Sequence, residues 1–101
     1  MTPGRKAAPS EDEALISKTV TICNERGLHA RAASKFVKLV AAFNAEVTVS
    51  KGGQSVSGTS ILGLMMLAAS LGTEIVITTS GPQAEDASAA LCELVEARFE
   101  E

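Results

Sequence analysis

Residues 24–40, NERGLHARAASKFVKLV, decide the fold, because a loop containing a glycine runs here into a segment with helical periodicity. From residue 30 to residue 43 apolar side chains recur at steps of three and four, with polar or charged residues between them. The pattern predicts an amphipathic helix over residues 30–43 whose buried face is made by Ala33, Phe36, Val37, Val40 and Phe43. This helix begins directly after His29, the single histidine of the chain.

The flanking segments alternate between strand and helix patterns. Residues 18–23 and 73–81 alternate apolar and polar side chains, as half-buried strands do, and residues 45–58 predict two strands joined by a Gly52-Gly53 turn. Helices are predicted over residues 59–72, capped by Thr59 or Ser60 and ended by Gly72, and over residues 82–99. The order β-α-β-β-α-β-α favours an α+β fold in which helices cover the single apolar face of a largely antiparallel sheet.

The length of 101 residues fits one domain. Residues 1–17 are rich in Pro, Gly, Ser and charges and predict a flexible N-terminal tail, so the domain is expected over residues 18–101. The final helix is expected to bury Ala84, Ala87, Leu91, Leu94 and Val95, and the helix before it to bury Leu64, Leu67 and Ala68.

Composition excludes several classes of function. The net charge is −3 and the basic residues form no long run, which argues against nucleic acid as a partner. Cys23 and Cys92 lie far apart with no clustered His or Cys, so we expect two buried, reduced thiols and no metal site. No segment has the pattern of a signal peptide or a membrane span, which predicts a cytoplasmic protein without membrane insertion.

His29 is expected at or near the N-cap of the first helix. The unpaired N–H groups and the dipole of a helix N-terminus attract anions, and the same positive field disfavours the imidazolium form of a histidine there. Arg31, two residues further on, offers a planar, permanently charged group for phosphate oxygens. These residues suggest phosphoryl transfer through histidine. The alternative is that His29 is an ordinary polar residue at a loop end and Arg31 a solvated surface charge.

Two motifs carry a resemblance to a known family. GLHARAASKFV at residues 27–37, followed by TSILGLMMLAA at residues 59–69, resembles the HPr family, the histidine-containing phosphocarrier proteins of the bacterial phosphoenolpyruvate-dependent sugar phosphotransferase system. The resemblance covers roughly residues 18–98. The first motif matches at Gly27, Leu28, His29, Ala30, Arg31 and Ala33, whereas Ala32 replaces the usual proline.

The resemblance implies an open-faced sandwich, a four-stranded antiparallel sheet covered on one face by three helices. It also implies a phosphoryl carrier that forms a covalent phosphohistidine, rather than a stand-alone turnover enzyme. Enzyme I would donate the phosphoryl group to His29, Arg31 would stabilise it, and an enzyme IIA protein or domain would receive it. No cofactor is expected, and we expect a monomer.

Two further sites are expected near the second helix. Ser60 falls at the position where many family members carry a serine that a dedicated kinase phosphorylates, although Thr59 replaces the usual preceding lysine; its alternative role is an N-cap alone. Ile61, Leu62, Met65 and Met66 exceed what one buried stripe needs, and they predict a docking patch for the carrier's partners.

The sequence is also compatible with two other hypotheses about the function. The protein could be a regulatory module of a nitrogen- or carbon-control branch that acts by phosphorylation-dependent protein binding. It could also be a small structural or ligand-binding domain in which His29 has no chemical role.

Overall fold

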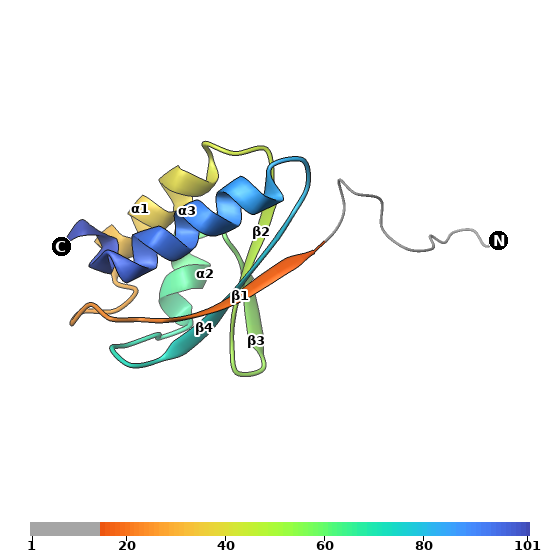
Figure 1. Cartoon of the computed structure of the whole chain (residues 1–101). Coiled ribbons are helices and arrows are strands. Elements are labelled where there is room, and N and C mark those ends of the chain that lie inside the picture. Colours follow the sequence, from red (N-terminus) through yellow and green to blue (C-terminus); the bar gives the residue numbers. More distant parts are fainter. Residues whose placement is uncertain (1–14) are drawn as a thin grey trace.

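The computed structural model describes residues 15–101 and contains a four-stranded antiparallel sheet with helices over one face (Figure 1). The elements follow in the order β1 (Ile16–Thr21), α1 (Ala30–Val40), β2 (Glu46–Lys51), β3 (Gln54–Ser57), α2 (Ile61–Met66), β4 (Glu74–Ser80) and α3 (Ala84–Glu96). The strands lie in the order β1-β4-β2-β3. The expected α+β open-faced sandwich is therefore confirmed.

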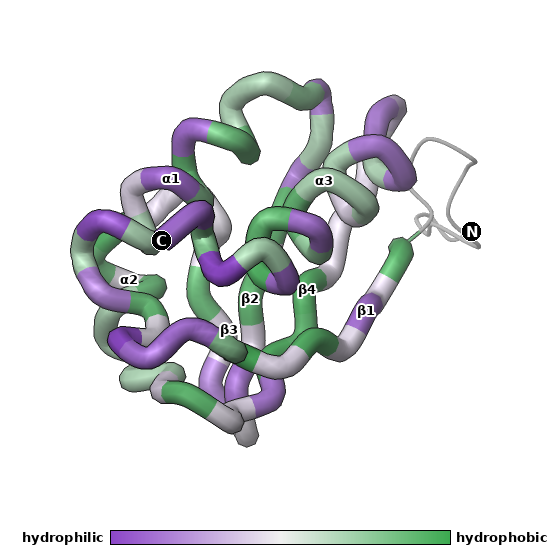
Figure 2. The backbone as a smooth tube through the Cα atoms, turned by 60° about the vertical axis from the view of Figure 1, so that its left-hand side comes forward, coloured by the Kyte–Doolittle hydropathy of each residue, from purple (hydrophilic) through white to green (hydrophobic). Residues whose placement is uncertain are grey.

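One face of the sheet is buried because its strands alternate between apolar and polar residues. Val47 and Val49 of β2 are buried, and so are Ile75 and Ile77 of β4. The register places Val49 opposite Ile77, and Val20 of β1 opposite Ile75, so the buried side chains form a continuous layer. In β1 only Val20 is buried, and Figure 2 shows a hydrophilic stretch between the hydrophobic ends of this strand.

The helices close this layer with their apolar faces. Figure 1 shows α1 and α3 side by side over the sheet, and α3 packs on β1 and β4 while α1 packs on α2 and α3. Phe36 of α1 and Phe99, which follows α3, are the two largest fully buried side chains. The residues expected to be buried in α3 are all buried, and so are Leu64 and Leu67.

The second helix is shorter than predicted. It ends at Met66, with Leu67 as its C-cap, and the chain turns at Ala68, where φ is 54°. The turn brings the carbonyl oxygen of Ala69 to the N–H of Leu28 at 3.0 Å, in the loop before α1. Ala69 is consequently buried, and the prediction of Ala68 as a core residue is wrong because Ala68 is exposed.

Other boundaries differ from the predictions by a few residues. β1 begins at Ile16, two residues before the expected start of the domain, and residues 1–14 of the expected tail lie outside the described residues. The strand β1 ends at Thr21, although Ile22 is buried and the N–H of Ile22 still donates to the carbonyl oxygen of Thr73. At the other end of the chain, α3 covers less than the predicted residues 82–99.

α1 ends three residues earlier than its apolar pattern predicts. After Val40 the N–H groups of Ala42 and Phe43 bond to carbonyl oxygens three residues back, which tightens the chain into a turn. Phe43 therefore contributes a partly buried side chain from outside the helix.

The two cysteines are free thiols, as expected, but both are only partly buried, so the prediction that they are buried is wrong. Burial nevertheless raises the pKa of the Cys92 thiol, and the charge of Glu96 raises it further. Both effects disfavour the thiolate, the form that reacts.

Candidate functional site

The loop between β1 and α1 is held in one conformation by its own backbone and by a buried amide. Asn24 is 2% exposed, and its Nδ2 donates to the oxygen of Gly27 at 2.9 Å. Gly27 has φ of 64°, which favours glycine, and a Cβ there would lie 2.3 Å from the oxygen of Ala69. The loop therefore passes so close to the segment after α2 that position 27 has no room for a side chain.

This loop delivers His29 to the N-cap of α1. Its backbone is extended (φ −77°, ψ −179°), and its carbonyl oxygen accepts the N–H of Ala33 at 2.8 Å, which closes the first helical turn. The side chain also acts as a cap, because Nδ1 accepts the N–H of Arg31 at 3.3 Å. The predicted placement of His29 at the N-cap is confirmed, and Nδ1 faces the unpaired N–H groups of the helix.

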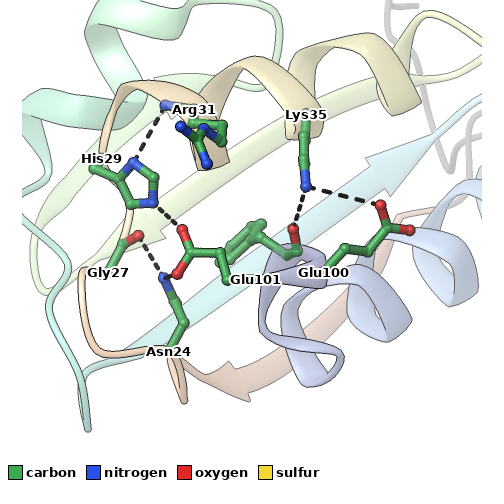
Figure 3. Close-up of polar contacts among 8 residues, drawn as sticks. Asn24, Gly27, His29, Arg31, Lys35, Glu100 and Glu101 are labelled. Atoms are coloured by element: carbon green, nitrogen blue, oxygen red, sulfur yellow. Dashed lines mark hydrogen bonds and ion pairs between the residues drawn. The ribbon is translucent and has the colours of Figure 1, made fainter.

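The opposite ring nitrogen has a partner that the sequence did not suggest. Figure 3 shows the carboxylate of Glu101 against the ring of His29, and the contact joins Oε2 to Nε2. The other carboxylate oxygen, Oε1, accepts from Nδ2 of Asn24 at 3.3 Å. The hydrogen bond with His29 lowers the pKa of the Glu101 carboxyl, partial burial opposes this, and the bond from Asn24 reinforces it.

Arg31 stands at the second position of α1 with an exposed side chain. Within residues 15–101 no carboxylate forms an ion pair with it. Its guanidinium is therefore available to an anion that enters beside Nδ1 of His29. Ala32, which replaces the proline of the related motif, is fully buried in the same turn.

The last turn of α2 and the segment that follows it lie beside His29. Ser60 is the N-cap, since its Oγ accepts the N–H of Gly63 at 2.9 Å, and the alternative cap Thr59 bonds instead to Ser57. A hollow of about 290 Å³ lies between the loop before α1 and the end of α2, and it is lined by Arg26, Leu28, His29, Met65, Ala68, Ala69 and Ser70.

The four apolar residues predicted as a docking patch are exposed. The exposed fractions are 40% for Ile61, 68% for Leu62, 40% for Met65 and 63% for Met66. These four residues are called the α2 patch below. Because Met65 also lines the hollow beside His29, the patch and the histidine belong to one continuous surface.

Asn24 and Glu101 are the site residues that sequence reasoning missed. Asn24 carries a weak local signal, an amide just before a glycine-containing loop, as in many loops closed by a side-chain hydrogen bond. Glu101 carries none, because it lies 72 positions from His29 and reaches it only through the folded chain.

The part of the chain that the structure describes, residues 15–101, contains no cluster of three or more His, Cys, Asp or Glu residues placed to hold a metal ion. None of the helices within that range is both long enough and apolar enough to cross a membrane.

Known proteins that resemble this chain are phosphocarrier proteins. The family model described as the PTS HPr component phosphorylation site matches residues 16–97. Phosphocarrier protein NPr of Shewanella violacea is 44% identical over 86 residues, which cover 85% of this chain and 94% of that protein. Phosphocarrier protein HPr of Cupriavidus necator is 40% identical over 87 residues, 86% of this chain and 98% of that protein.

A solved structure of a phosphocarrier protein has the same fold as this chain. The crystal structure of HPr from Thermoanaerobacter tengcongensis superposes with a TM-score of 0.81 at 36% identity, and the match covers 85% of this chain and 97% of that one. The chain belongs to the HPr family of phosphocarrier proteins. It is accordingly a phosphoryl carrier of the phosphotransferase system, as the resemblance of its motifs implied.

Proposed function

We propose that Nδ1 of His29 is the atom that carries the phosphoryl group. The observation that supports this is the assignment of the two ring nitrogens: Nε2 is engaged by Glu101, whereas Nδ1 points to the N-terminus of α1. Only Nδ1 faces a group of N–H donors that can receive phosphoryl oxygens. Its bond to the Arg31 N–H is long, at 3.3 Å, and is readily exchanged for a bond from that N–H to the phosphoryl group.

The transfer step needs no proton to leave the ring. The lone pair of Nδ1 attacks phosphorus, the bond from phosphorus to the donor breaks, and its electron pair returns to the donor. A neutral ring protonated at Nε2 thereby becomes a cationic ring that is bonded to phosphorus at Nδ1 and to hydrogen at Nε2. Onward transfer reverses these changes and restores the neutral ring.

Arg31 and the N-terminus of α1 stabilise the charge on the transferred group. The phosphoryl oxygens keep their negative charge throughout, the N–H of Arg31 lies at Nδ1, and the guanidinium of the same residue would reach the group from the first turn of the helix. Arg31 would act by holding the group in place for the next acceptor.

The donor and the acceptor that we propose are enzyme I and an enzyme IIA protein or domain, and the transfer takes place in the cytoplasm. The purified chain is incubated with labelled phosphoenolpyruvate and enzyme I, freed of enzyme I, and then mixed with candidate IIA proteins. We expect label on the chain in the first step and its transfer to a IIA protein in the second. Absence of label after the first step would contradict the carrier function.

A regulatory role is the second candidate. The similarity to a protein named NPr as well as to proteins named HPr fits a carrier that serves a nitrogen- or carbon-control branch. Onward transfer separates the two roles: a sugar-transport carrier gives its label to a sugar-specific IIA protein, whereas a regulatory module gives it only to a regulatory one or retains it while binding a partner.

The α2 patch would be the surface that docks enzyme I and the IIA proteins in turn. Met65 of the patch lines the hollow beside His29, and methionines adapt to partners of different shape. Exposed apolar residues that gather on one surface are typical of interaction sites.

Leu62→Asp should weaken docking without unfolding the protein. Leu62 is 68% exposed, so the change removes little buried area but places a charge in the interface, and we expect binding to enzyme I to weaken about tenfold or more. The matched control is Leu15→Asp, which changes an equally exposed leucine (70%) before β1. Binding is measured by titration calorimetry and stability by thermal melting. Equal binding in the two variants, or a steep fall in melting temperature for Leu62→Asp, would remove the patch from the docking surface.

Ser60 would be a regulatory phosphorylation site for a serine kinase. A phosphate at this N-cap would be tolerated by the fold, but it would lie beside the α2 patch and must be desolvated when a partner docks. Ser60→Asp keeps a preferred cap residue and should therefore keep its melting temperature, while phosphorylation of His29 by enzyme I slows through weaker association. Ser55→Asp in β3 is the control for added charge. Unchanged rates in protein phosphorylated at Ser60 itself would leave Ser60 as a cap only.

A further inference from the structure

The segment that follows α3 takes an unusual path. Arg98, Phe99 and Glu100 have φ values of 59°, 54° and 64°, a left-handed conformation that L-residues other than glycine rarely adopt, still less three in succession. Such a conformation persists only where the surrounding structure imposes it. Contacts with the rest of the protein must therefore stabilise the backbone conformation of residues 97–101.

Three contacts hold this segment. The side chain of Phe99 is completely buried in the core, and Nζ of Lys35 in α1 donates to the carbonyl oxygen of Phe99 at 2.7 Å. The same Nζ lies 3.8 Å from Oε1 of Glu100, a weaker and more exposed pair. Figure 1 shows the result, in which the end of the chain lies beside the start of α1 rather than continuing along the axis of α3.

The turn places Glu101 where both of its carboxylate oxygens have a partner. Oε2 contacts Nε2 of His29, and Oε1 accepts from the amide of Asn24, which is itself fixed by its bond to Gly27 (Figure 3). The carboxylate is thus oriented by the loop that also delivers the histidine. Its hydrogen bonds to His29 and Asn24 and the positive charge of Arg26 lower the pKa of the Glu101 carboxyl, while partial burial raises it, so the group is held in its ionised form.

Both ends of the imidazole ring then specify one tautomer. Nδ1 accepts an N–H and must have a free lone pair, whereas Nε2 faces a carboxylate and must carry the proton. This is the tautomer in which Nδ1 can attack phosphorus without first losing a proton.

We propose that Glu101 is a positioning residue for phosphoryl transfer, which fixes the Nε2–H tautomer of His29 and balances the positive charge that the ring acquires when Nδ1 is bonded to phosphorus. The role rests on the proposed function of His29. In the transfer step no proton moves, and the ring changes from neutral to cationic while Nε2–H stays bonded to the carboxylate. A carboxylate that orients a histidine and stabilises its cationic form works in the same way in hydrolytic triads.

The proposal is tested on the full chain with two variants and a neighbouring control. Glu101→Gln keeps an oxygen acceptor but removes the charge, and Glu101→Ala removes both. Glu100→Gln changes the adjacent, exposed carboxylate, which contacts only Lys35 and not the ring. Thermal melting of all three variants checks that the fold is retained.

The first measurement is the tautomer of His29, read from long-range proton–nitrogen correlation spectra of the unphosphorylated protein at a mildly alkaline pH. We expect the Nε2–H tautomer to dominate in the wild type and in Glu100→Gln, and a mixture of tautomers in Glu101→Ala. Dominance of the Nδ1–H tautomer in the wild type, or an unchanged tautomer in Glu101→Ala, would overturn the proposal.

The second measurement is the rate of phosphoryl transfer from enzyme I. A charge-assisted hydrogen bond to the ring that strengthens during transfer predicts that Glu101→Gln is slower by about threefold to tenfold, while Glu100→Gln is as fast as the wild type. Equal rates in Glu101→Gln and the control would refute the charge-balancing role. If the wild type itself accepts no phosphoryl group, the proposed function fails, and the tautomer of the unphosphorylated protein still decides whether Glu101 orients the ring.

Discussion

His29→Asn should abolish phosphorylation by enzyme I while the protein stays folded. Asparagine is among the preferred N-cap residues, so α1 keeps its cap, but an amide nitrogen has no lone pair that can attack phosphorus. The loss should be complete rather than partial, because the substitution removes the atom that forms the bond and no other histidine exists in the chain. The measurement is uptake of labelled phosphoryl from phosphoenolpyruvate and enzyme I, with the melting temperature as the check on folding.

The chemical stability of the label separates His29 from any other acceptor. Phosphorus bonded to an imidazole nitrogen is lost in acid and kept in alkali, whereas a serine phosphate is stable in acid. We expect wild-type label with the first behaviour and none on His29→Asn. Acid-labile label at wild-type levels on His29→Asn would show that the acceptor is elsewhere.

Gly27→Ala should give the largest loss of stability among substitutions at the site. A Cβ at this position would lie 2.3 Å from the oxygen of Ala69 and 2.9 Å from the Cα of Ser70, both backbone atoms that cannot rotate away. The overlap adds to the cost of a positive φ, and together they predict a loss of about 2–5 kcal/mol in the free energy of unfolding. The displaced loop would also move His29, so phosphoryl transfer should fall in the fraction that remains folded.

Gly52→Ala is the matched control for that prediction. Gly52 has nearly the same φ, 61°, but no atom lies within 4 Å of a Cβ built there. Its loss of stability should therefore be about 1–2 kcal/mol, the cost of the conformation alone. Chemical denaturation of both variants measures the difference. Equal losses would mean that the close approach of the loop to Ala69 is absent in solution.

Patterns among residues close together in the sequence predicted much of the fold and the position of His29 in the site. The apolar periodicity of α1 and the glycine before it placed His29 at a helix N-cap, which the structure confirms through the bond from the Arg31 N–H to Nδ1. The alternation of β2 and β4 likewise identified the buried valines and isoleucines. These features depend on residues close together in the sequence, where spacing alone carries the information.

The features that the sequence missed depend on contacts between distant segments. α2 ends before the predicted boundary because the following turn brings Ala69 to Leu28. The pattern of residues 59–72 does not predict that turn. From the sequence, Glu101 is expected to be a surface charge after an apolar helix. In the structure the left-handed turn, which is held by Lys35 and by the burial of Phe99, places Glu101 against His29. Tertiary packing thus decided both the length of a helix and the partner of the functional ring.

The position of phosphorus on the histidine ring is the most direct test of the account. Protein labelled with ¹⁵N in histidine is phosphorylated by enzyme I, and the coupling between phosphorus and each ring nitrogen is measured by nuclear magnetic resonance. We expect coupling to Nδ1 of His29, with the proton on Nε2, because Nδ1 faces the N-terminus of α1 and Nε2 faces Glu101. Coupling to Nε2, or phosphorus on another residue, would contradict the assignment of Nδ1 as the carrier atom.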